Sequence, residues 1–569
     1  MIKNQNAQAL IAAIAIMLVL ALFSVVAMSL IGMQTSQTAT GLSESTQAFY
    51  LAHAGLEWYM QQLAEDDDWS DEVAPAAQSL GSGTFEISLS NQSTDSIDVK
   101  STGKILGPDA RNRERWMSAT IKREALVDYA VFWHQDGPGA QLTFSNSGSG
   151  TDVVGDMWSI GSANIGSNSS ITGGKIYYAQ GETVTGSGSY TAQVVPPPFP
   201  QIPSLDTTYY DDLMTDWNAR IDAADSNISS GSGDLTLSSD VDWTGQNISR
   251  RDIDTNGFDI TGTNFTVTCR SFNLENNSEI DSNASNFTIN CNRDFNMTGN
   301  SQINADDYRI NCSRNFLMSG TSNINSSDFE LYLDDDFDSN GTVSITGYGY
   351  IVCSDIGQIN LHDATTDSGT FTATPSGGSI YFLSGTDMTV NSTQNDTGVI
   401  LNSGCFLYSR NPSGTTDTLT IRNEDTTIDG ATIIAERRII VEDGADITDS
   451  VLYVGYASSN SNNELSITDS STTVTGTVIS RGRNVPSLRI NNSASVTGLV
   501  YQYDGVGTLG RAEVDGGSTI TGALLVRQFD GNSFGPATVT YDEDSLPSPL
   551  PEGFQSSGVE IESGSWDGL

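Results

Sequence analysis

Two short motifs in this chain carry carboxylates at the spacing of a calcium-binding loop. The segments DIDTNG (252–257) and DFDSNG (336–341) both follow the pattern D-x-D-x-N-G. Neither has a glutamate at the twelfth position of such a loop, where the chain carries Thr263 and Gly347. Because Asn and Gly tolerate positive φ angles, the same residue types also suit tight turns. We therefore expect no metal site and no cofactor, with Ca2+ at these turns as the alternative.

Thiols are the next candidates for chemistry. The chain has no C-x-x-C pair and no histidine cluster, which are the patterns that hold zinc. Three of the cysteines take the same place in successive repeats, so we expect a stacked ladder of buried, small thiols. A disulfide between neighbouring repeats is the alternative, because stacking brings their Cα atoms into bonding range. The five residues are Cys269, Cys291, Cys312, Cys353 and Cys405.

Acid–base residues give little support for catalysis. The three histidines, His53, His134 and His362, lie in three different segments. The aspartates at 334–336 are consecutive, so they cannot all face one groove. We therefore expect neither a catalytic residue nor a cofactor-binding residue, and no enzyme activity.

The charge balance narrows the choice of partner. The chain has 25 Lys and Arg against 70 Asp and Glu, which is a formal net charge of −45. Such a surface cannot neutralise phosphates, so we exclude nucleic acid as a partner and disfavour docking to anionic lipid headgroups. The charge favours solubility in salt.

The elements that would position these residues begin with an apolar segment. Residues 9–33 carry no charge, and as a helix they would be roughly 37 Å long, enough to cross a bilayer. Lys3 is the only basic residue before Lys100, so the positive-inside rule predicts a cytoplasmic N-terminus and an exported remainder. A cleaved secretory signal is the alternative, although its apolar region would be shorter.

An amphipathic helix pattern continues through residues 41–65, GLSESTQAFYLAHAGLEWYMQQLAE. Its stretch AFYLAHAGLE (48–57) resembles that of type IV pilins, most closely the PilX-like minor pilins. The resemblance implies a leader, MIKNQNA, that prepilin peptidase removes between Ala7 and Gln8. The family usually has Gly where this chain has Ala7, and Glu where it has Ala12. In the family that glutamate pairs with a neighbouring subunit's amine, so its absence suits a tip or initiating position, or membership of the looser PilX-like group.

The resemblance also implies partners and a location. Other pilin or minor pilin subunits would pack against the N-terminal helix. Before assembly the chain would be a single-pass protein of the bacterial inner membrane, N-terminus inside, with its head in the periplasm or outside the cell. After assembly it would lie at the cell surface, in a pilus.

Residues 83–124 alternate apolar and polar side chains with a period of two, as at Phe85, Ile87 and Leu89. Turn-forming residues occur at 91–95 and at Gly103. The pattern predicts a small antiparallel sheet, which agrees with the pilin-like head that the resemblance implies.

The rest of the chain is repetitive, and short β-type runs alternate with Asn, Ser, Gly and Asp. A constant period without helices predicts a parallel β-helix of roughly 15–18 coils, each stacked ~4.8 Å on the last. Aromatic residues begin lines spaced by 22, 21, 21 and 21 residues at Phe265, Phe287, Tyr308, Phe329 and Tyr350. A second type of repeat, with variable spacing, has an apolar residue at the same place in each copy: Ile428, Ile447, Val474, Val496 and Ile520.

One segment interrupts the repeats. It starts Pro-rich at 194 and then becomes helical, with Asp206 or Thr207 as the cap. We expect a side helix that covers apolar surface of the rod, with a partner-binding element as the alternative. Its apolar face comprises Tyr210, Leu213, Met214, Trp217, Ile221 and Ala224. His134, in FWHQDG, opens the β-helix, where it could contact the cap.

The predicted fold is therefore mainly β: a long pilin-like transmembrane α-helix, a small antiparallel sheet, and a long parallel β-helix. The predicted parts are a leader (1–7), the N-terminal helix (8–64), the small sheet domain (65–126), first β-helix coils (127–193), a Pro-rich loop with a side helix (194–230), the main parallel β-helix (231–548) and a C-terminal tail (549–569).

Two functions remain open at this point. The first is a minor, tip-located pilus subunit whose β-helix head serves adhesion to a glycan or surface, or filament assembly. The alternative is a membrane-anchored β-helix enzyme acting on carbohydrate, a polysaccharide lyase or hydrolase. A groove with convergent Asp, Arg and aromatic residues would favour the enzyme, and exposed ladders of Asn, Ser and Thr would favour adhesion.

Overall fold

The computed structural model of the chain forms two compact units, Met1–Leu126 with Ser556–Leu569, and Val127–Gln555. It describes residues 36–63, 73–81, 83–92, 96–106, 112–123, 129–134, 141–144, 150–195, 205, 207–224, 228–281, 284–362, 369–391, 398–410, 417–455, 464–481, 486–502, 510–530, 533–547 and 559–561.

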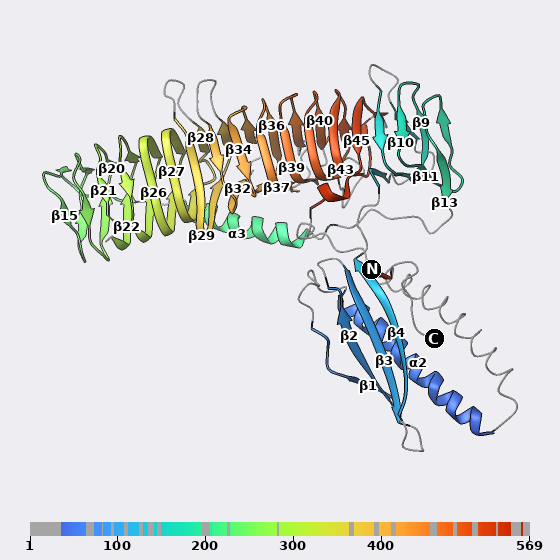
Figure 1. The fold of residues 1–569 in the computed structure, drawn as a ribbon. Helices are drawn as coiled ribbons and strands as arrows, with labels where there is room; N and C mark the ends of the chain where they lie inside the picture. Colours follow the sequence, from blue (N-terminus) through green and yellow to red (C-terminus); the bar gives the residue numbers. More distant parts are fainter. Residues whose placement is uncertain are drawn as a thin grey trace. The chain divides into compact units, whose positions relative to one another are not determined.

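The first unit is one helix packed on an antiparallel sheet (Figure 1). The helix is α2 (Ser36–Leu63), and the sheet order is β1-β2-β3-β4-β46. The strands are β1 (Gln78–Leu80), β2 (Gly83–Ser90), β3 (Ser96–Leu106), β4 (Asn112–Arg123) and β46 (Val559–Ile561). The predicted small sheet is confirmed. The strand at 559–561, within the predicted tail, was not expected.

Period-two alternation buries one face of this sheet against α2. Leu56, Tyr59 and Leu63 of the helix pack on Phe85 and on the strand residues Ile87, Ile97, Val99, Ala119 and Ile121. The prediction that Gly103 marks a turn is wrong, because Gly103 lies inside β3. A Cβ there would be 2.0 Å from the Ala48 carbonyl oxygen, so this glycine lets the helix approach the strand.

The predicted transmembrane segment, with Ala7, Gln8 and Ala12, lies outside the described residues. Within the described ranges, no helix combines the length and apolarity needed to span a membrane. α2 corresponds to the predicted amphipathic continuation of that segment.

The second unit is a parallel β-solenoid of about 16 turns, which confirms the predicted mainly β architecture. Each turn passes through three faces, which we name the helix face, the ion-pair face and the threonine face. Seven strands turn a corner and contribute to more than one face: β26 (Phe316–Leu333), β27 (Phe337–Cys353), β29 (Phe371–Ser384), β37 (Asp446–Val454), β39 (Thr473–Ser480), β41 (Ser495–Gln502) and β43 (Ser518–Val526).

The other strands belong to single faces. The helix face contains β16 (Asn247–Ser249), β19 (Thr266–Cys269), β22 (Ser285–Cys291), β25 (Asp306–Cys312), β32 (Cys405–Ser409), β35 (Thr432–Ala435), β5 (Val131–Trp133), β8 (Met157–Ser159), β11 (Ile176–Ala179) and β13 (Ala192–Val195). The ion-pair face contains β14 (Leu235–Thr236), β17 (Asp252–Asp254), β20 (Ser271–Leu274), β23 (Phe295–Met297), β28 (Ile359–His362), β30 (Met388–Asn391), β33 (Leu419–Arg422), β36 (Arg438–Glu442), β38 (Glu464–Thr468), β40 (Leu488–Asn491) and β42 (Ala512–Val514).

The threonine face contains β15 (Val241–Asp242), β18 (Ile260–Thr261), β21 (Glu279–Ile280), β24 (Gln302–Ile303), β31 (Val399–Leu401), β34 (Thr426–Asp429), β45 (Ala537–Thr540), β7 (Asp152–Val154) and β10 (Ser170–Thr172). A separate four-stranded parallel sheet, in the order β12-β9-β6-β44, comprises β6 (Gln141–Phe144), β9 (Ser162–Ile165), β12 (Val184–Gly186) and β44 (Ser533–Phe534).

Similar side chains stack along the inside of the solenoid. The first four predicted aromatic starts pair in register, and the rings of Phe265 and Phe287 lie 4.7 Å apart at 3°. Tyr350 departs from this line: Phe329 pairs with Gly349 after a register shift, so Tyr350 pairs with Glu330 and points outward. A one-residue shift moves a side chain to the other face of a strand. The second type of repeat is confirmed, since Ile428, Ile447, Val474, Val496 and Ile520 stack in register.

The cysteine ladder is confirmed. Cys269 pairs with Cys291 and Cys291 with Cys312 in adjacent turns, and all five cysteines are buried free thiols. The Sγ atoms of Cys269 and Cys291 are 3.5 Å apart. Burial raises the pKa of the Cys291 thiol well above its usual range, so the thiol stays neutral.

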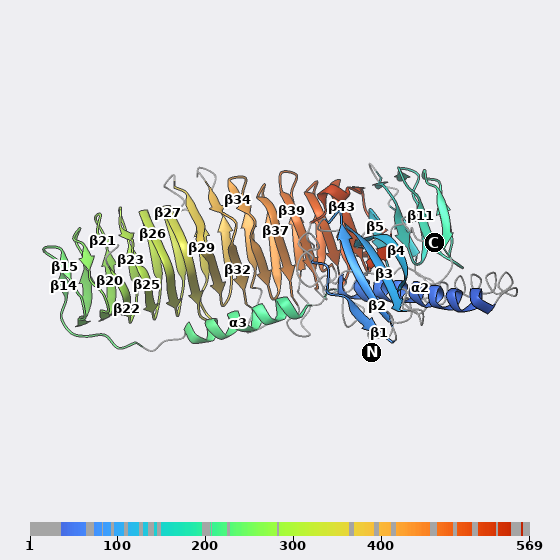
Figure 2. The same ribbon diagram turned by 60° about the horizontal axis from the view of Figure 1, so that its bottom comes forward.

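The order of the turns in space differs from their order in the sequence (Figures 1 and 2). The coils at 129–195, first in sequence, stack on the last ones: Leu524 pairs with Val131, and Val539 pairs with Val153. The other end of the solenoid begins at β14. His134 therefore does not lie at a cap, because β5 is enclosed between β43 and β8.

α3 (Thr208–Ala224) lies between β13 and β14 in the sequence and packs on the side of the solenoid (Figure 2). The predicted helix is confirmed, with five of its six apolar residues buried and Leu213 half-buried. The Tyr210 ring stacks on Tyr453 at 4.1 Å, and Trp217 packs against Tyr408 at 5.2 Å. The prediction that this helix covers apolar surface of the rod is confirmed.

Candidate functional site

Both calcium-loop motifs are engaged in structural contacts. In the first, Arg270 pairs with the Asp252 carboxylate, and Asp254 accepts a hydrogen bond of 2.9 Å from the Asn256 backbone. Asn256 has a φ of 50° and lies in a tight turn. A hydrogen bond with Asp254 raises the pKa of Glu275. The Asp252 carboxylate is thus neutralised by arginine, which makes it a poor cation ligand.

In the second motif, Asp336 accepts a hydrogen bond of 2.9 Å from the Gln358 backbone, and Asp338 accepts one of 2.8 Å from Asn360 Nδ2. Burial raises the pKa of the Asp336 carboxyl. Gly341 has a φ of 95°. Within the described ranges, no group of three or more His, Cys, Asp or Glu could hold a metal ion.

The histidines belong to separate elements. His53 lies in α2 with Nδ1 3.6 Å from the Glu57 carboxylate. His134 follows β5, where its backbone N–H donates to the Val526 carbonyl, and His362 ends β28. The structure therefore places the three histidines on three separate elements.

The ion-pair face carries a continuous charge ladder. Arg438 is 3.1 Å from Glu464, Glu464 is 3.2 Å from Arg489, and Arg489 is 3.1 Å from Glu513. Glu464 is only 9% exposed, so this ladder joins turns through partly buried pairs. Its carboxylates are committed to arginines within the rod.

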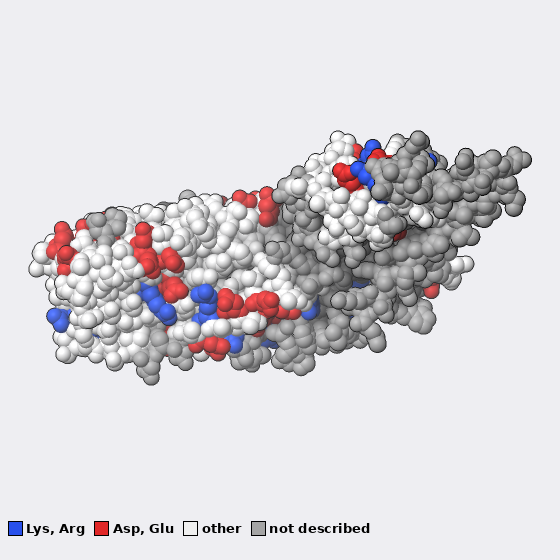
Figure 3. Space-filling view, turned by 90° about the horizontal axis from the view of Figure 1, so that it is seen from below, with Lys and Arg blue, Asp and Glu red and all other residues white. Residues whose placement is uncertain are grey.

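On the helix face, aromatic, basic and acidic residues do converge, but α3 packs over them. The Arg220 guanidinium lies 3.8 Å from the centre of the Tyr350 ring, and Arg481 pairs with Asp211 at 3.2 Å. Arg410 bridges Asp222 and Asp355 at 2.5 and 2.8 Å. Figure 3 shows charged side chains gathered in a band on this side of the solenoid, with most of its other described surface there uncharged.

The threonine face is the open polar surface of the solenoid. On each turn an apolar residue points inward between two outward side chains, and these outward side chains align with those of the next turn. In the earlier turns they include Asn323, Asn325, Ser344 and Thr346. In the later turns they are mostly threonine. This arrangement makes two parallel ranks of mostly small polar groups on a rigid sheet. Apolar Ile400 and Val154 and acidic Asp429 and Asp446 interrupt them.

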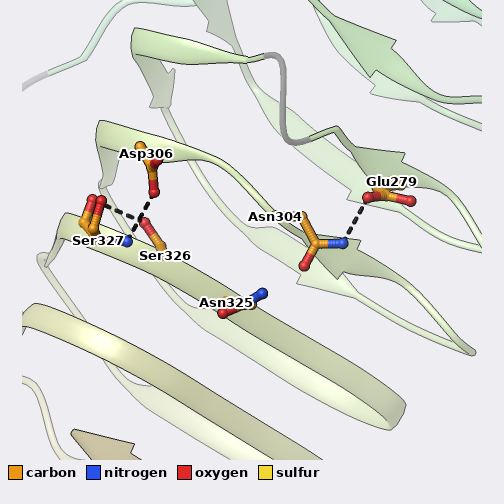
Figure 4. Close-up of a pocket in the computed structure, with 6 residues that line it drawn as sticks. All are labelled: Glu279, Asn304, Asp306, Asn325, Ser326 and Ser327. Atoms are coloured by element: carbon orange, nitrogen blue, oxygen red, sulfur yellow. Dashed lines mark hydrogen bonds between the residues drawn. The ribbon is translucent and has the colours of Figure 1, made fainter. Parts of the chain in front are cut away.

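A shallow depression of about 390 Å³ lies at the Asn-rich end of this face (Figure 4). It is lined by Glu279, Asn304, Asp306, Asn325, Ser326 and Ser327. Asn304 Nδ2 donates to Glu279 at 2.6 Å, and the Ser327 backbone donates to Asp306 at 3.0 Å. Without an aromatic or basic side chain, this lining suits hydrogen bonding to hydroxyls or water rather than acid–base chemistry.

The sequence carries a signal for these ranks. The segments TTVTG, ASVTG and STITG place Thr or Ser on both sides of each inward Val or Ile. The prediction used only the apolar residue between them. No protein-family model, curated protein or solved structure matches this chain.

Proposed function

We propose that this chain is a PilX-like minor pilin subunit, anchored in the membrane or located at a filament tip. Its β-solenoid head binds a surface through the threonine face. The observation that carries the proposal is the double rank of outward Asn, Ser and Thr along one face. A rigid sheet holds these groups in fixed positions, so little conformational entropy is lost on binding. A broad, repeating surface suits a repeating ligand.

The helix-and-sheet unit supports the pilin part of the proposal. α2 packs through Ala48, Ala52 and Gly55 of AFYLAHAGLE, and a Cβ at Gly55 would be 2.4 Å from Ser101 Oγ. The residues that carry the resemblance thus include those that allow close helix–sheet packing. A head of this size suits a rare subunit at a filament tip better than every position of a lattice.

The carbohydrate-active enzyme is less well supported. Its expected convergence of Asp, Arg and aromatic residues occurs beneath α3, where Trp217 and Tyr210 are 1% exposed. A substrate chain would have to displace this packed helix. On the threonine face, the depression offers no basic or aromatic group.

Processing gives the first test. We expect the mature protein to begin at Gln8, because the resemblance implies cleavage after Ala7. Mass spectrometry of the surface-exposed protein should show this N-terminus. Ala7→Gly should be processed equally well, whereas Ala7→Trp should block cleavage and retain the leader. An intact Met1 on the wild-type surface protein would contradict the proposal, and a cut near residues 28–35 would support a secretory signal instead.

The adhesion role is tested in a strain that lacks the gene. We expect fewer cells to attach to the native substratum, with recovery on wild-type expression and none on expression of the Ala7→Trp variant. Unchanged attachment in the deletion strain would refute the adhesion role.

A further inference from the structure

Four consecutive turns of the threonine face carry only threonine and serine. Each turn contributes two outward residues, and the pairs align in register from β39 through β41 and β43 to β45. Between them, Val474, Val496, Ile520 and Val539 are at most 1% exposed and hold the strands flat on the core. The two ranks are Thr473, Ser495, Thr519, Thr538 and Thr475, Thr497, Thr521, Thr540.

These eight positions differ chemically from the rest of the rod. None is ionisable or aromatic, although the chain has 70 acidic residues. In the same turns, the neighbouring ion-pair face carries Arg489 and Glu513. The lack of charge is local to these four turns, because the flanking turns of the same face carry Asp446 and Asp152 in register with Thr473 and Thr538.

The hydroxyls of the ranks are turned outward. That of Thr473 donates to the Asp446 carboxylate of the preceding turn, and the others are available. Within the described part of the chain, those of Thr497, Thr519, Thr521 and Thr540 have no hydrogen-bond partner, nor do those of Ser495 and Thr538. On the Asn-rich turns, by contrast, the polar groups satisfy one another, as Asn304 does with Glu279 at 2.6 Å and Asn402 with Thr374 at 3.0 Å. Apart from Thr473, the threonine turns leave their hydroxyls to an external partner.

The backbones of adjacent turns lie close together at the corner that follows the two ranks. Gly476, Gly498 and Gly522 stack at one corner with φ of 128°, 126° and 123°. A Cβ on Gly498 would lie 2.0 Å from the Gly476 carbonyl oxygen. Glycine allows the sharp backbone turn at this corner. Because it has no side chain, it adds no bulk beside the ranks.

The ranks form a two-dimensional lattice. Adjacent strands lie about 4.8 Å apart, and residues two positions apart along a strand are separated by about 6.6 Å. A partner that engages all eight groups must repeat in both directions at similar distances. Water molecules on the prism face of ice do so, and methyl and hydroxyl groups together can order water into that pattern. A crystalline polysaccharide would favour aromatic stacking platforms, which these ranks lack.

We propose that the turns from Thr473 to Thr540 bind ice. The inference names the ligand of the adhesion role proposed above and rests on that role for its purpose in the cell. The binding itself needs only the solenoid face. An attached cell would be held at an ice surface by many weak contacts that are individually reversible and collectively strong.

The test measures uptake of the purified full chain, in detergent micelles, into slowly grown ice. We expect wild-type protein to enter the ice and the double variant Thr497→Lys with Thr521→Lys to be depleted by roughly tenfold or more, since two long charged side chains hold the face off the lattice. Thr420→Lys, on the ion-pair face, should enter like wild type. Equal thermal unfolding midpoints of the three proteins would show that the loss is not caused by misfolding.

Exclusion of the wild-type chain from ice, or equal uptake of the double variant, would overturn the inference. Exclusion from ice together with retention on crystalline cellulose or chitin would overturn it in favour of a polysaccharide ligand. Uptake into ice by a chain that is absent from filaments would support ice binding and refute the pilus role. A chain that is present on filaments but is excluded from ice would support the pilus role and refute ice binding.

Discussion

Replacing Cys291 by aspartate is expected to lower the free energy of unfolding by roughly 3–5 kcal/mol, the effect of an unpaired buried charge. Cys291 is fully buried between Cys269 and Cys312 of the adjacent turns. These thiols offer weak donors and no positive charge. The loss should appear as a lower thermal unfolding midpoint and faster proteolysis of the full chain.

Asn290→Asp is the matched control, because Asn290 is on the outer side of the same strand. Its side-chain oxygen accepts a hydrogen bond of 2.7 Å from Asn311, and a carboxylate can still accept it. We expect little change. Equal stability of the two variants would place Cys291 on the outer face and refute the register.

The destabilisation caused by Cys291→Asp should depend on pH, in the direction set by the pKa shift of the introduced carboxyl. Burial should raise the pKa of the introduced carboxyl in the folded protein above its unfolded value of about 4. The destabilisation relative to wild type is then greatest above that raised pKa. It should shrink as the pH falls from the raised pKa to about 4 and be smallest below that pH, where the group is neutral in both states.

Val539→Asp is expected to have an effect of similar size, roughly 3–5 kcal/mol, for a reason that depends on the order of turns. Val539 is fully buried, with Ile520 on one side and Val153 on the other. If the turns stacked in sequence order, Val539 would lie in the last turn with one side uncovered. The variant therefore measures whether the coils at 129–195 cover it.

Thr540→Asp is the control for this site. Thr540 is in the same strand, faces outward and is half-exposed beside Val154. We expect its thermal unfolding midpoint to stay near that of wild type. If Val539→Asp left the unfolding midpoint unchanged while Cys291→Asp lowered it, the stacking of the N-terminal coils at this end would be contradicted.

Most of the inner structure could be predicted from the sequence because it repeats. The period near 21 determines which residues stack, so the cysteine ladder and the line through Ile447 and Val474 were found correctly. Tyr350 was misplaced because spacing alone cannot reveal the register shift after Ser327. Gly103 was misread because a glycine needed for close packing resembles one needed for a turn.

The order of turns could not be predicted in this way. Periodicity shows that a coil stacks on another coil, but not which one, since every coil end presents similar apolar rows. The pairing of Leu524 with Val131 depends on contacts between residues almost 400 positions apart. The candidate face was missed for a different reason: outward Thr residues carry no signal for core packing, and their meaning emerges only when adjacent turns are in register.

The central claim is that the solenoid is a surface-binding head at a filament tip. Electron microscopy of isolated filaments, labelled with gold-conjugated antibody to the solenoid, tests it most directly. The account predicts label at filament ends, and none on filaments from the deletion strain. Dense label along the shafts would contradict it.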